Sequence, residues 1–188
     1  MSETPYGFDA AKLRAARTAA GTSVARIAQA AGVSERAVSL YLAGTRTPRP
    51  EILPRLAAAV GVDPAALCTV ERETLAHLRI FTGRSRSAMA RTLGMAEETY
   101  RQVETTGRRG RLARARYDRN EDRWAAWQEW ASPLFGVTPE RLDAAEEHTR
   151  EQYLAELERG WQRLREADPD RAARIEELGR EGRRLRGQ

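Results

Sequence analysis

The stretch that decides the fold is GTSVARIAQAAGVSERAVSLYLAG, residues 21–44. Its first half carries apolar residues at helical spacing, namely Val24, Ile27, Ala28 and Ala31. Ser23 can cap this helix, Gly32 can end it in a left-handed conformation, and Ser34 can cap a second helix. The inward residues of that second helix are Ala37, Val38 and Tyr41, and Gly44 closes it. Because the turn between them is so short, the two helices must cross steeply.

Two helices of this length cannot bury their apolar faces against each other alone, so flanking helices must complete the core. The spacing of apolar residues predicts one such helix around residues 9–20 and another around residues 51–60. The run GVDPAAL, residues 61–67, follows the second of them. Within this run Asp63 can act as an N-cap, and Pro64 suits the first helical position. These signals predict a small five-helix domain.

The pattern returns further along the chain, in GRSRSAMARTLGMAEETYRQVETT, residues 83–106. A shift of 62 superposes these residues: Leu75 on Leu13, Arg79 on Arg17, Gly83 on Gly21, Ser85 on Ser23, Met89-Ala90 on Ile27-Ala28, Gly94 on Gly32 and Glu97 on Glu35. GVTPERL, residues 136–142, then repeats GVDPAAL with a shift of 75, so the second copy carries an insertion. The chain therefore contains an internal repeat, which predicts a second module.

The first copy, from Leu13 to Leu67, resembles the helix-turn-helix domain of the Cro/C1 phage-repressor family, also called the XRE family. The resemblance is carried by Arg17, Gly21, Ser23, Ile27-Ala28, Gly32-Val33-Ser34, Val38, Gly44, Pro48, Leu56 and GVDPAAL. It implies that the helix after the Gly-Val-Ser turn enters the major groove of duplex DNA. The DNA-binding residues that it implies in the first copy are Ser34, Glu35, Arg36, Ser39 and Leu40. Arg36 is the best candidate for a base contact, because arginine to guanine is the commonest specific pairing.

The second copy implies a reading face made of Glu97, Glu98, Arg101 and Gln102. Arg86 stands where the first copy has Val24 and where the family usually has a phosphate-binding Gln. The family's Arg–Glu pair is present here as Arg79 and Glu104, whereas in the first copy Leu42 occupies the place of the glutamate that would pair with Arg17. Two acids at the start of a recognition helix repel phosphate, although glutamate can accept a hydrogen bond from cytosine. Whether this module reads DNA or binds protein stays open at this point.

The insertion lies in TGRRGRLARARYDRN, residues 106–120. The arginines that we assign to DNA in this segment are Arg108, Arg109, Arg111 and Arg114. With two glycines and little apolar area, the segment cannot fold alone. It is either a solvated loop or an arm that lies along phosphate or in a minor groove. Beyond it, Trp124, Trp127 and Trp130 fall at helical spacing, which predicts a buried helix face in the second module rather than a platform on which bases stack.

Charge and the C-terminal pattern separate the tail from the rest. Residues 1–70 carry a net charge of +3, residues 71–120 carry +6, and residues 121–188 carry −4. The tail has a narrow apolar stripe of Tyr153 or Leu154, Leu157, Trp161 and Leu164, up to a break at Asp168-Pro169-Asp170. A stripe of this kind is typical of a helix that pairs with one other helix. It pairs either with a second chain, giving a homodimer, or with the chain's own second module.

Other classes of function lack support. Cys68 is the sole cysteine, and His77 and His148 are the two histidines, so a metal site is not expected. No Ser-His-Asp set or glycine-rich phosphate loop appears, and we expect no catalytic residue and no cofactor. An apolar run of about 18 residues, as a bilayer span requires, is missing. Because the start of the chain also lacks the features of a signal peptide, we expect a cytoplasmic protein that does not bind membranes.

The fold class predicted is all-α, with two tandem five-helix Cro/C1-like helix-turn-helix modules and a C-terminal helical extension. The modules span residues 1–70 and 71–142, the second with its Arg-rich insertion at 106–120, and the extension spans 143–188. The predicted function is sequence-specific binding of duplex DNA by a bacterial, phage or plasmid transcriptional regulator. Two alternatives are a protein-interaction adaptor or antirepressor on the same scaffold, and a DNA-processing accessory factor.

Overall fold

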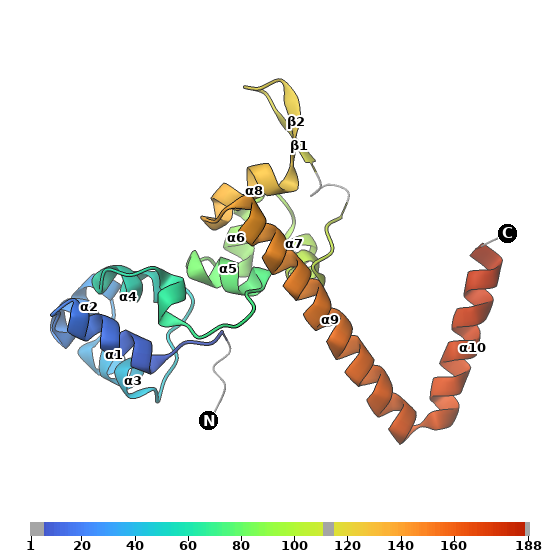
Figure 1. Cartoon of the computed structure of the whole chain (residues 1–188), viewed down its shortest axis with the longest axis horizontal. Helices are drawn as coiled ribbons and strands as arrows, with labels where there is room; N and C mark the ends of the chain where they lie inside the picture. The colour runs from blue at the N-terminus through green and yellow to red at the C-terminus, as the bar shows by residue number, and fades with distance from the viewer. Residues whose placement is uncertain (1–5, 111–114, 187–188) are drawn as a thin grey trace. The chain divides into compact units, whose positions relative to one another are not determined.

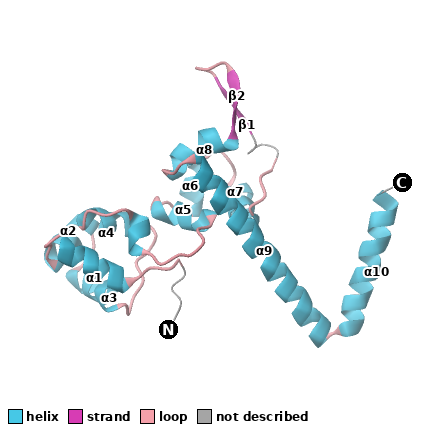
Figure 2. Ribbon diagram, in the orientation of Figure 1, coloured by secondary structure: helices cyan, strands magenta, loops and turns pink. Residues whose placement is uncertain are grey.

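The structure, a computed structural model, describes residues 6–110 and 115–186, and it is mostly helical (Figures 1 and 2). The elements are α1 (Ala10–Ala19), α2 (Val24–Ala31), α3 (Glu35–Ala43), α4 (Leu53–Ala59), the 3-10 helix η1 (Pro64–Leu67), α5 (Leu75–Phe81), α6 (Arg86–Thr92), α7 (Glu97–Thr106), β1 (Ala115–Asp118), β2 (Arg123–Ala126), α8 (Trp127–Phe135), α9 (Pro139–Ala167) and α10 (Pro169–Arg186). Within the described ranges, none of the helices is both long enough and apolar enough to span a membrane.

The predicted boundaries of α2 and α3 are confirmed, and local chemistry explains them. Ser23 Oγ accepts a hydrogen bond from the Arg26 amide at 3.2 Å, and Ser34 Oγ accepts one from the Ala37 amide at 3.2 Å. Gly32, with φ of 68°, ends α2 in the left-handed region, where a side chain would be strained. The helices predicted around residues 9–20 and 51–60 are α1 and α4, and the fifth helix of this domain is the short η1.

The core of residues 6–70 is apolar and is enclosed by α1 to α4 and η1. Its fully buried side chains include Leu13, Ile27, Val38, Leu53, Leu56 and Leu67. The segment before α1 adds two aromatic rings to this core, Tyr6 and Phe8. Phe8 forms an antiparallel bridge with Cys68, and the Tyr6 hydroxyl donates a hydrogen bond to the Pro48 carbonyl at 2.5 Å. The two ends of the domain are thereby tied together.

Residues 75–145 enclose a second apolar core. Its fully buried side chains include Leu75, Leu78, Met89, Tyr100, Trp127 and Leu142. The helices around it follow the spacing of the first core: α6 and α7 begin at Arg86 and Glu97, where the shift of 62 places the starts of α2 and α3. Pro139 opens α9 as Pro64 opens η1, in agreement with the shift of 75 between their two sequence runs.

A β-hairpin inside residues 106–126 departs from the all-helical expectation. β1 and β2 pair antiparallel, with Tyr117 opposite Trp124 and Arg116 opposite Ala125. The described end of the insertion, from residue 115, is therefore ordered as a strand rather than as a flexible loop. The placement of Trp124 on a buried helix face is wrong, since this residue lies in β2 and is 69% exposed. Trp127, in contrast, is fully buried in α8 as expected.

The first part of α9 belongs to the second core. The Leu75 amide donates a hydrogen bond to Thr149 Oγ1 at 3.0 Å, so a residue of α9 satisfies one free amide at the start of α5. Arg141 donates to both carboxylate oxygens of Glu73, each at 2.8 Å. Contacts divide the chain into two compact units, residues 1–149 and 150–188. The helix α9 continues without interruption past the predicted domain boundary at residue 142.

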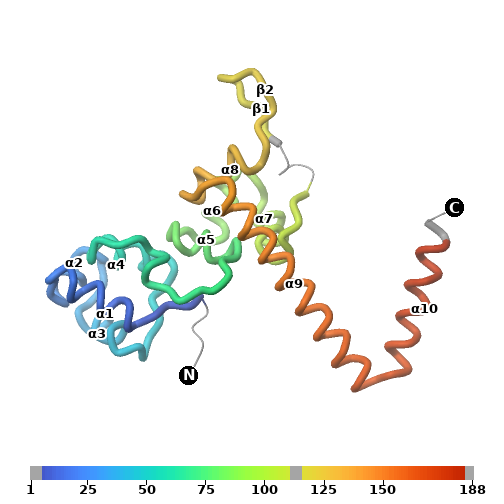
Figure 3. The backbone as a smooth tube through the Cα atoms, in the orientation of Figure 1, coloured from blue at the N-terminus to red at the C-terminus, as the bar shows by residue number. Residues whose placement is uncertain are grey.

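The second unit holds the end of α9 and all of α10. The predicted break is confirmed, because α9 ends at Ala167 and Pro169 opens α10. The backbone tube in Figure 3 turns between these two helices. Asp168 caps the new helix by accepting a hydrogen bond from the Arg171 amide at 3.0 Å. Apolar side chains in this unit lie open to solvent, among them Leu154, Leu157, Ile175 and Leu178.

Candidate nucleic-acid interface

The exposed face of α3 carries the residues that the sequence assigns to DNA. Ser34, Glu35, Arg36 and Ser39 are exposed, and Leu40 is half-buried. The opposite face of the same helix packs Val38, Tyr41 and Leu42 into the core. The helix therefore has one fixed face and one free polar face. Its first turn presents both an exposed cation and the backbone amides of a helix N-terminus.

Leu42 lies at the end of α3, at the position that corresponds to Glu104 in the second core. Leu42 is buried in the core, where a carboxylate would need a partner. Its carbonyl oxygen accepts a hydrogen bond from Arg14 Nη1 at 2.5 Å, which holds the end of α3 against α1. Arg17, the residue that would pair with a glutamate here, is half-exposed at the end of α1.

Two short helices joined at a left-handed glycine, the second with a serine cap and a free polar face, make a helix-turn-helix. Residues 10–67 match the model of a family described as "Helix-turn-helix domain". The match begins with α1 and ends with η1, so it covers the whole of the first core's helices. Neither the curated proteins nor the solved structures compared with the chain match it. Residues 10–67 therefore form a helix-turn-helix domain, a fold whose usual ligand is DNA.

The helices α6 and α7 also meet at a left-handed glycine, Gly94, with φ of 66°. Ser85 caps α6 through a hydrogen bond from the Ala88 amide at 3.2 Å, but Ala96, before α7, has no capping side chain. The four residues assigned to a second reading face are all exposed: Glu97, Glu98, Arg101 and Gln102.

Two of these four residues bind each other. Arg101 donates two hydrogen bonds to the Glu98 carboxylate, at 2.8 and 2.6 Å. The hydrogen bond from Arg101 lowers the pKa of the Glu98 carboxyl. Since both side chains are more than half exposed, water screens the pair and DNA or a protein can open it at little cost.

A buried carboxylate joins α5, α6 and α7. Glu104 accepts hydrogen bonds from Arg79 Nε at 2.5 Å and Nη2 at 3.3 Å, and from Arg86 Nε at 2.7 Å. Burial alone would raise the pKa of Glu104, but the hydrogen bonds from Arg79 and Arg86 outweigh it and lower that pKa. Arg79 is almost fully buried, while half of the Arg86 side chain is exposed. The network therefore fixes an outward-facing guanidinium at the start of α6.

The arginines of the insertion differ in what they contact. Arg108 is exposed after the end of α7. Arg109 Nη2 lies 2.9 Å from a carboxylate oxygen of Glu146, which is buried on α9. This ion pair gives Arg109 a structural partner, which the sequence did not indicate. Arg111 and Arg114 lie outside the described residues.

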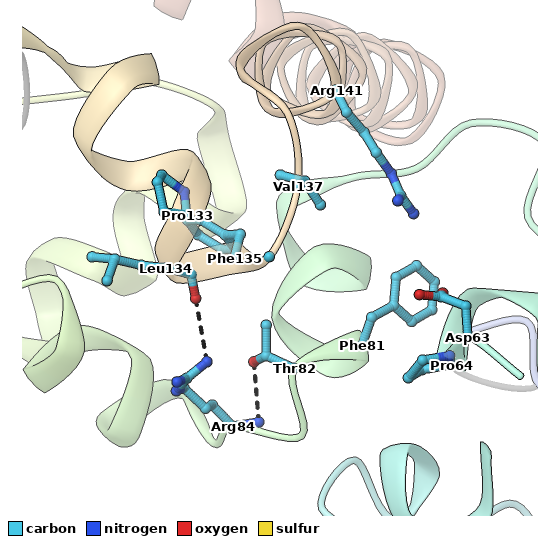
Figure 4. A pocket seen from close by; sticks show the side chains of 11 residues that line it. Asp63, Pro64, Phe81, Thr82, Arg84, Pro133, Leu134, Phe135, Val137 and Arg141 are labelled. Atoms are coloured by element: carbon cyan, nitrogen blue, oxygen red, sulfur yellow. Dashed lines mark hydrogen bonds between the residues drawn. The ribbon is translucent and has the colours of Figure 1, made fainter. Parts of the chain in front are cut away.

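A pocket of about 300 Å³ lies between η1, α5 and the end of α8 (Figure 4). Its polar side chains have partners within the chain: Arg84 Nη1 donates to the Leu134 carbonyl at 3.2 Å, and Arg141 is held by Glu73. Phe81, Asp63 and Arg141 line it on the side away from Leu134 (Figure 4). The described part of the chain holds no cluster of side chains that could bind a metal ion.

Cys68 is not a reactive thiol. Its side chain is buried, and burial raises the pKa of the thiol to about 12, so almost none of it is thiolate near neutral pH. The aromatic pair Tyr117 and Trp124 on the hairpin is the surface feature that sequence reasoning missed. A signal was present, because residues alternate through Arg116, Tyr117 and Asp118 before a polar turn, as in a β-hairpin.

Proposed function

We propose that this chain is a sequence-specific duplex DNA-binding protein that acts as a bacterial, phage or plasmid transcriptional regulator in the cytoplasm. The observation that carries the proposal is the free polar face of α3 inside a helix-turn-helix domain. A helix presented in this way fits the major groove, with its first turn toward the base edges.

Each residue that the sequence assigns to DNA on α3 and its cap has a role in this proposal. Arg36 donates two hydrogen bonds to O6 and N7 of a guanine, and Glu35 accepts from the amino group of a cytosine. Leu40 meets a thymine methyl group, while Ser34 and Ser39 contact the flanking backbone. Arg36 therefore sets the preference at one base pair.

Residues 71–142 are, in this proposal, a second module of the same Cro/C1 type. Three features support it: a core of its own, helices that begin at the repeat-related positions of their counterparts, and the ion pair of Arg79 with Glu104. Arg86, at the start of α6 and paired with Glu104, contacts one DNA phosphate. Arg108, beyond the end of α7, contacts another. The residues that face the bases are Glu97, Glu98, Arg101 and Gln102.

A second candidate function rests on the acids of α7. Glu97 and Glu98 stand in its first turn, and Arg101 is bound to Glu98, so the face carries little free positive charge. Such a face suits a basic protein surface better than phosphate. In this version the first module binds DNA and α7 docks another regulator, as in an adaptor or antirepressor.

We also propose that the second unit forms a homodimer. Leu154 and Leu157 are about half exposed on α9 although they share a stripe with Trp161 and Leu164. Burial of this exposed apolar stripe against a second helix is favourable, because it removes apolar area from water. The acidic residues around the stripe make DNA a poor partner.

Selection of bound sites from random duplexes with the full chain tests the function. We expect one preferred sequence, and a higher affinity for it than for scrambled DNA at fixed salt. Arg36→Ala should abolish that preference at one base pair, while Arg174→Ala, a matched exposed arginine in the second unit, should not. Recovery of no enriched sequence, with equal weak binding to all duplexes, would refute sequence-specific recognition.

A further inference from the structure

The helix α5 contributes side chains to both cores. Leu75 and Leu78 are fully buried in the second core. Ile80 is buried in the first core instead, because residues two apart on a helix point to different sides. Phe81, the last residue of α5, is partly buried and packs against both cores. The two cores, which lie within the one compact unit of residues 1–149, are therefore joined by apolar side chains of a single helix.

The chain directly after α5 also packs closely on the first core's helices. A methyl group added at Gly83 would lie 3.0 Å from Cγ of Pro54, which belongs to α4. Gly83 has φ of 73°, in the left-handed region that favours glycine. A side chain at this position would therefore crowd Pro54, and its absence allows α4 and the end of α5 to approach each other.

The segment that joins the two cores is short and is held at both of its ends. Val70 packs against the first core. The Glu73 carboxylate accepts two hydrogen bonds from Arg141, which lies on α9 beside the second core. Only residues 71 and 72 separate these attachments, and two residues span about 7 Å at most. Domains of one chain usually move relative to each other unless an apolar interface prevents it, and here a short link adds to such an interface.

We propose that the packing of Ile80 and Phe81 holds α3 and α7 at one fixed separation, so that the chain recognises two unlike half-sites of duplex DNA at a single spacing. The inference rests on the proposed function, because it requires both α3 and α7 to read DNA. Each base pair inserted between the half-sites shifts one of them by about 3.4 Å and turns it by about 35° around the duplex. Two modules that are fixed to each other do not follow that change. Ile80 and Phe81 are positioning residues, which set the spacing from the interior of the protein.

The distance between α3 and α7 in the free protein tests the fixed separation without DNA. Spin labels are attached at Ser39→Cys and Gln102→Cys, both exposed positions, in a full-length Cys68→Ala background. Labelled protein is diluted with unlabelled protein, so that distances within one chain are measured. We expect double electron–electron resonance to give one narrow distribution. Ile80→Ser, combined with a Gly-Ser-Gly-Ser insertion between residues 71 and 72, should broaden it.

A matched control separates the interface from the insertion. It carries the same Gly-Ser-Gly-Ser insertion together with Ile175→Ser, at an exposed apolar position of the second unit. Because Ile80 and Phe81 are intact in this control, we expect it to keep the narrow distribution of the parent. Circular dichroism of each variant checks that the helices are retained.

Affinity for duplexes of altered spacing tests the consequence for DNA. Selection from random duplexes supplies the two half-sites, and one or two base pairs are then inserted between them. The parent should lose roughly tenfold or more in affinity for one inserted base pair, because one module loses its contacts. The variant with Ile80→Ser and the insertion should discriminate between spacings by about threefold or less, as two flexibly linked modules do. Its affinity for each half-site alone should equal that of the parent.

The outcomes distinguish the fixed separation from the proposed function. If selection yields a half-site for only one module per chain, reading of DNA by both modules fails, and the single spacing fails with it. If both half-sites are recovered, but the parent tolerates inserted base pairs or already has a broad distribution of label distances, the fixed separation is refuted. If the Ile80→Ser variant binds every spacing more weakly with the parent's preference unchanged, Ile80 contributes stability alone and the positioning role is refuted.

Discussion

Arg79 reaches Glu104 at 2.5 Å in the interior of residues 71–149, and both side chains are almost completely buried. At the position 62 residues earlier in the chain, the first core has Leu42. The second core therefore has an ion pair between α5 and α7, whereas the first core has the apolar side chain of Leu42 on α3. The difference yields a direct test of what the pair contributes.

Glu104→Leu should lower the free energy of unfolding by roughly 3–5 kcal/mol, because it leaves the buried guanidinium of Arg79 without its carboxylate. Adding Arg79→Met should recover much of that loss, since a buried ion pair is often replaceable by apolar residues of similar volume. Urea denaturation of the single and double variants measures both effects. A double variant less stable than Glu104→Leu alone would contradict this account.

Stability should fall as the pH drops from about 7 to 5. His77 Nδ1 accepts a hydrogen bond from the Thr74 amide at 3.0 Å, and burial lowers the pKa of His77 below its usual 6.5. The unfolded chain therefore binds a proton at His77 more readily than the folded chain does. The stability that neutral His77 contributes is fully present above pH 6.5 and is lost as the pH falls below it. Thermal unfolding at several pH values measures this. His77→Gln should flatten the curve of stability against pH; parallel curves for His77→Gln and the parent would refute the assignment.

Substitutions of Arg108 and Arg109 in the insertion should affect the salt dependence of DNA binding differently. Arg108→Ala should weaken binding to all duplexes alike. It should also reduce the slope of log affinity against log salt by about one, as the loss of one phosphate contact requires. Arg109→Ala should instead lower thermal stability, since Arg109 pairs with the buried Glu146. Arg36→Ala should cost about 1–3 kcal/mol on the preferred site alone. Fluorescence anisotropy over a salt series measures these slopes, and an unchanged slope for Arg108→Ala would remove that phosphate contact.

Truncation after residue 150 should leave a folded monomer. The first unit ends at Thr149, whose hydroxyl accepts the hydrogen bond from the Leu75 amide, so that contact survives the cut. Light scattering should report a dimer for the full chain and a monomer for the fragment, with helical circular dichroism retained. In the full chain, Leu157→Glu should give the same change of mass, while Glu158→Gln, its exposed neighbour, should not. If the number of chains per particle stays the same after both truncation and Leu157→Glu, the dimer is contradicted.

Short-range signals were enough to predict the helix-turn-helix. Ser23 and Ser34 cap their helices, and Gly32 has the left-handed conformation that ends α2. Each of these features is decided by a residue and its near neighbours in the chain, because capping hydrogen bonds and backbone sterics act over one turn. The break before Pro169 follows the same logic.

The tertiary structure alone decided the rest of the site. Arg109 meets Glu146 and Thr149 caps α5, each across a long stretch of sequence. Trp124 turns outward because β2 alternates its side chains where helical spacing had placed it inside. The sequence around Arg109 does not indicate whether its guanidinium pairs with a carboxylate or faces solvent. The partner is set by how the cores pack, and only that packing brings a buried charge from α9 within 2.9 Å of the insertion.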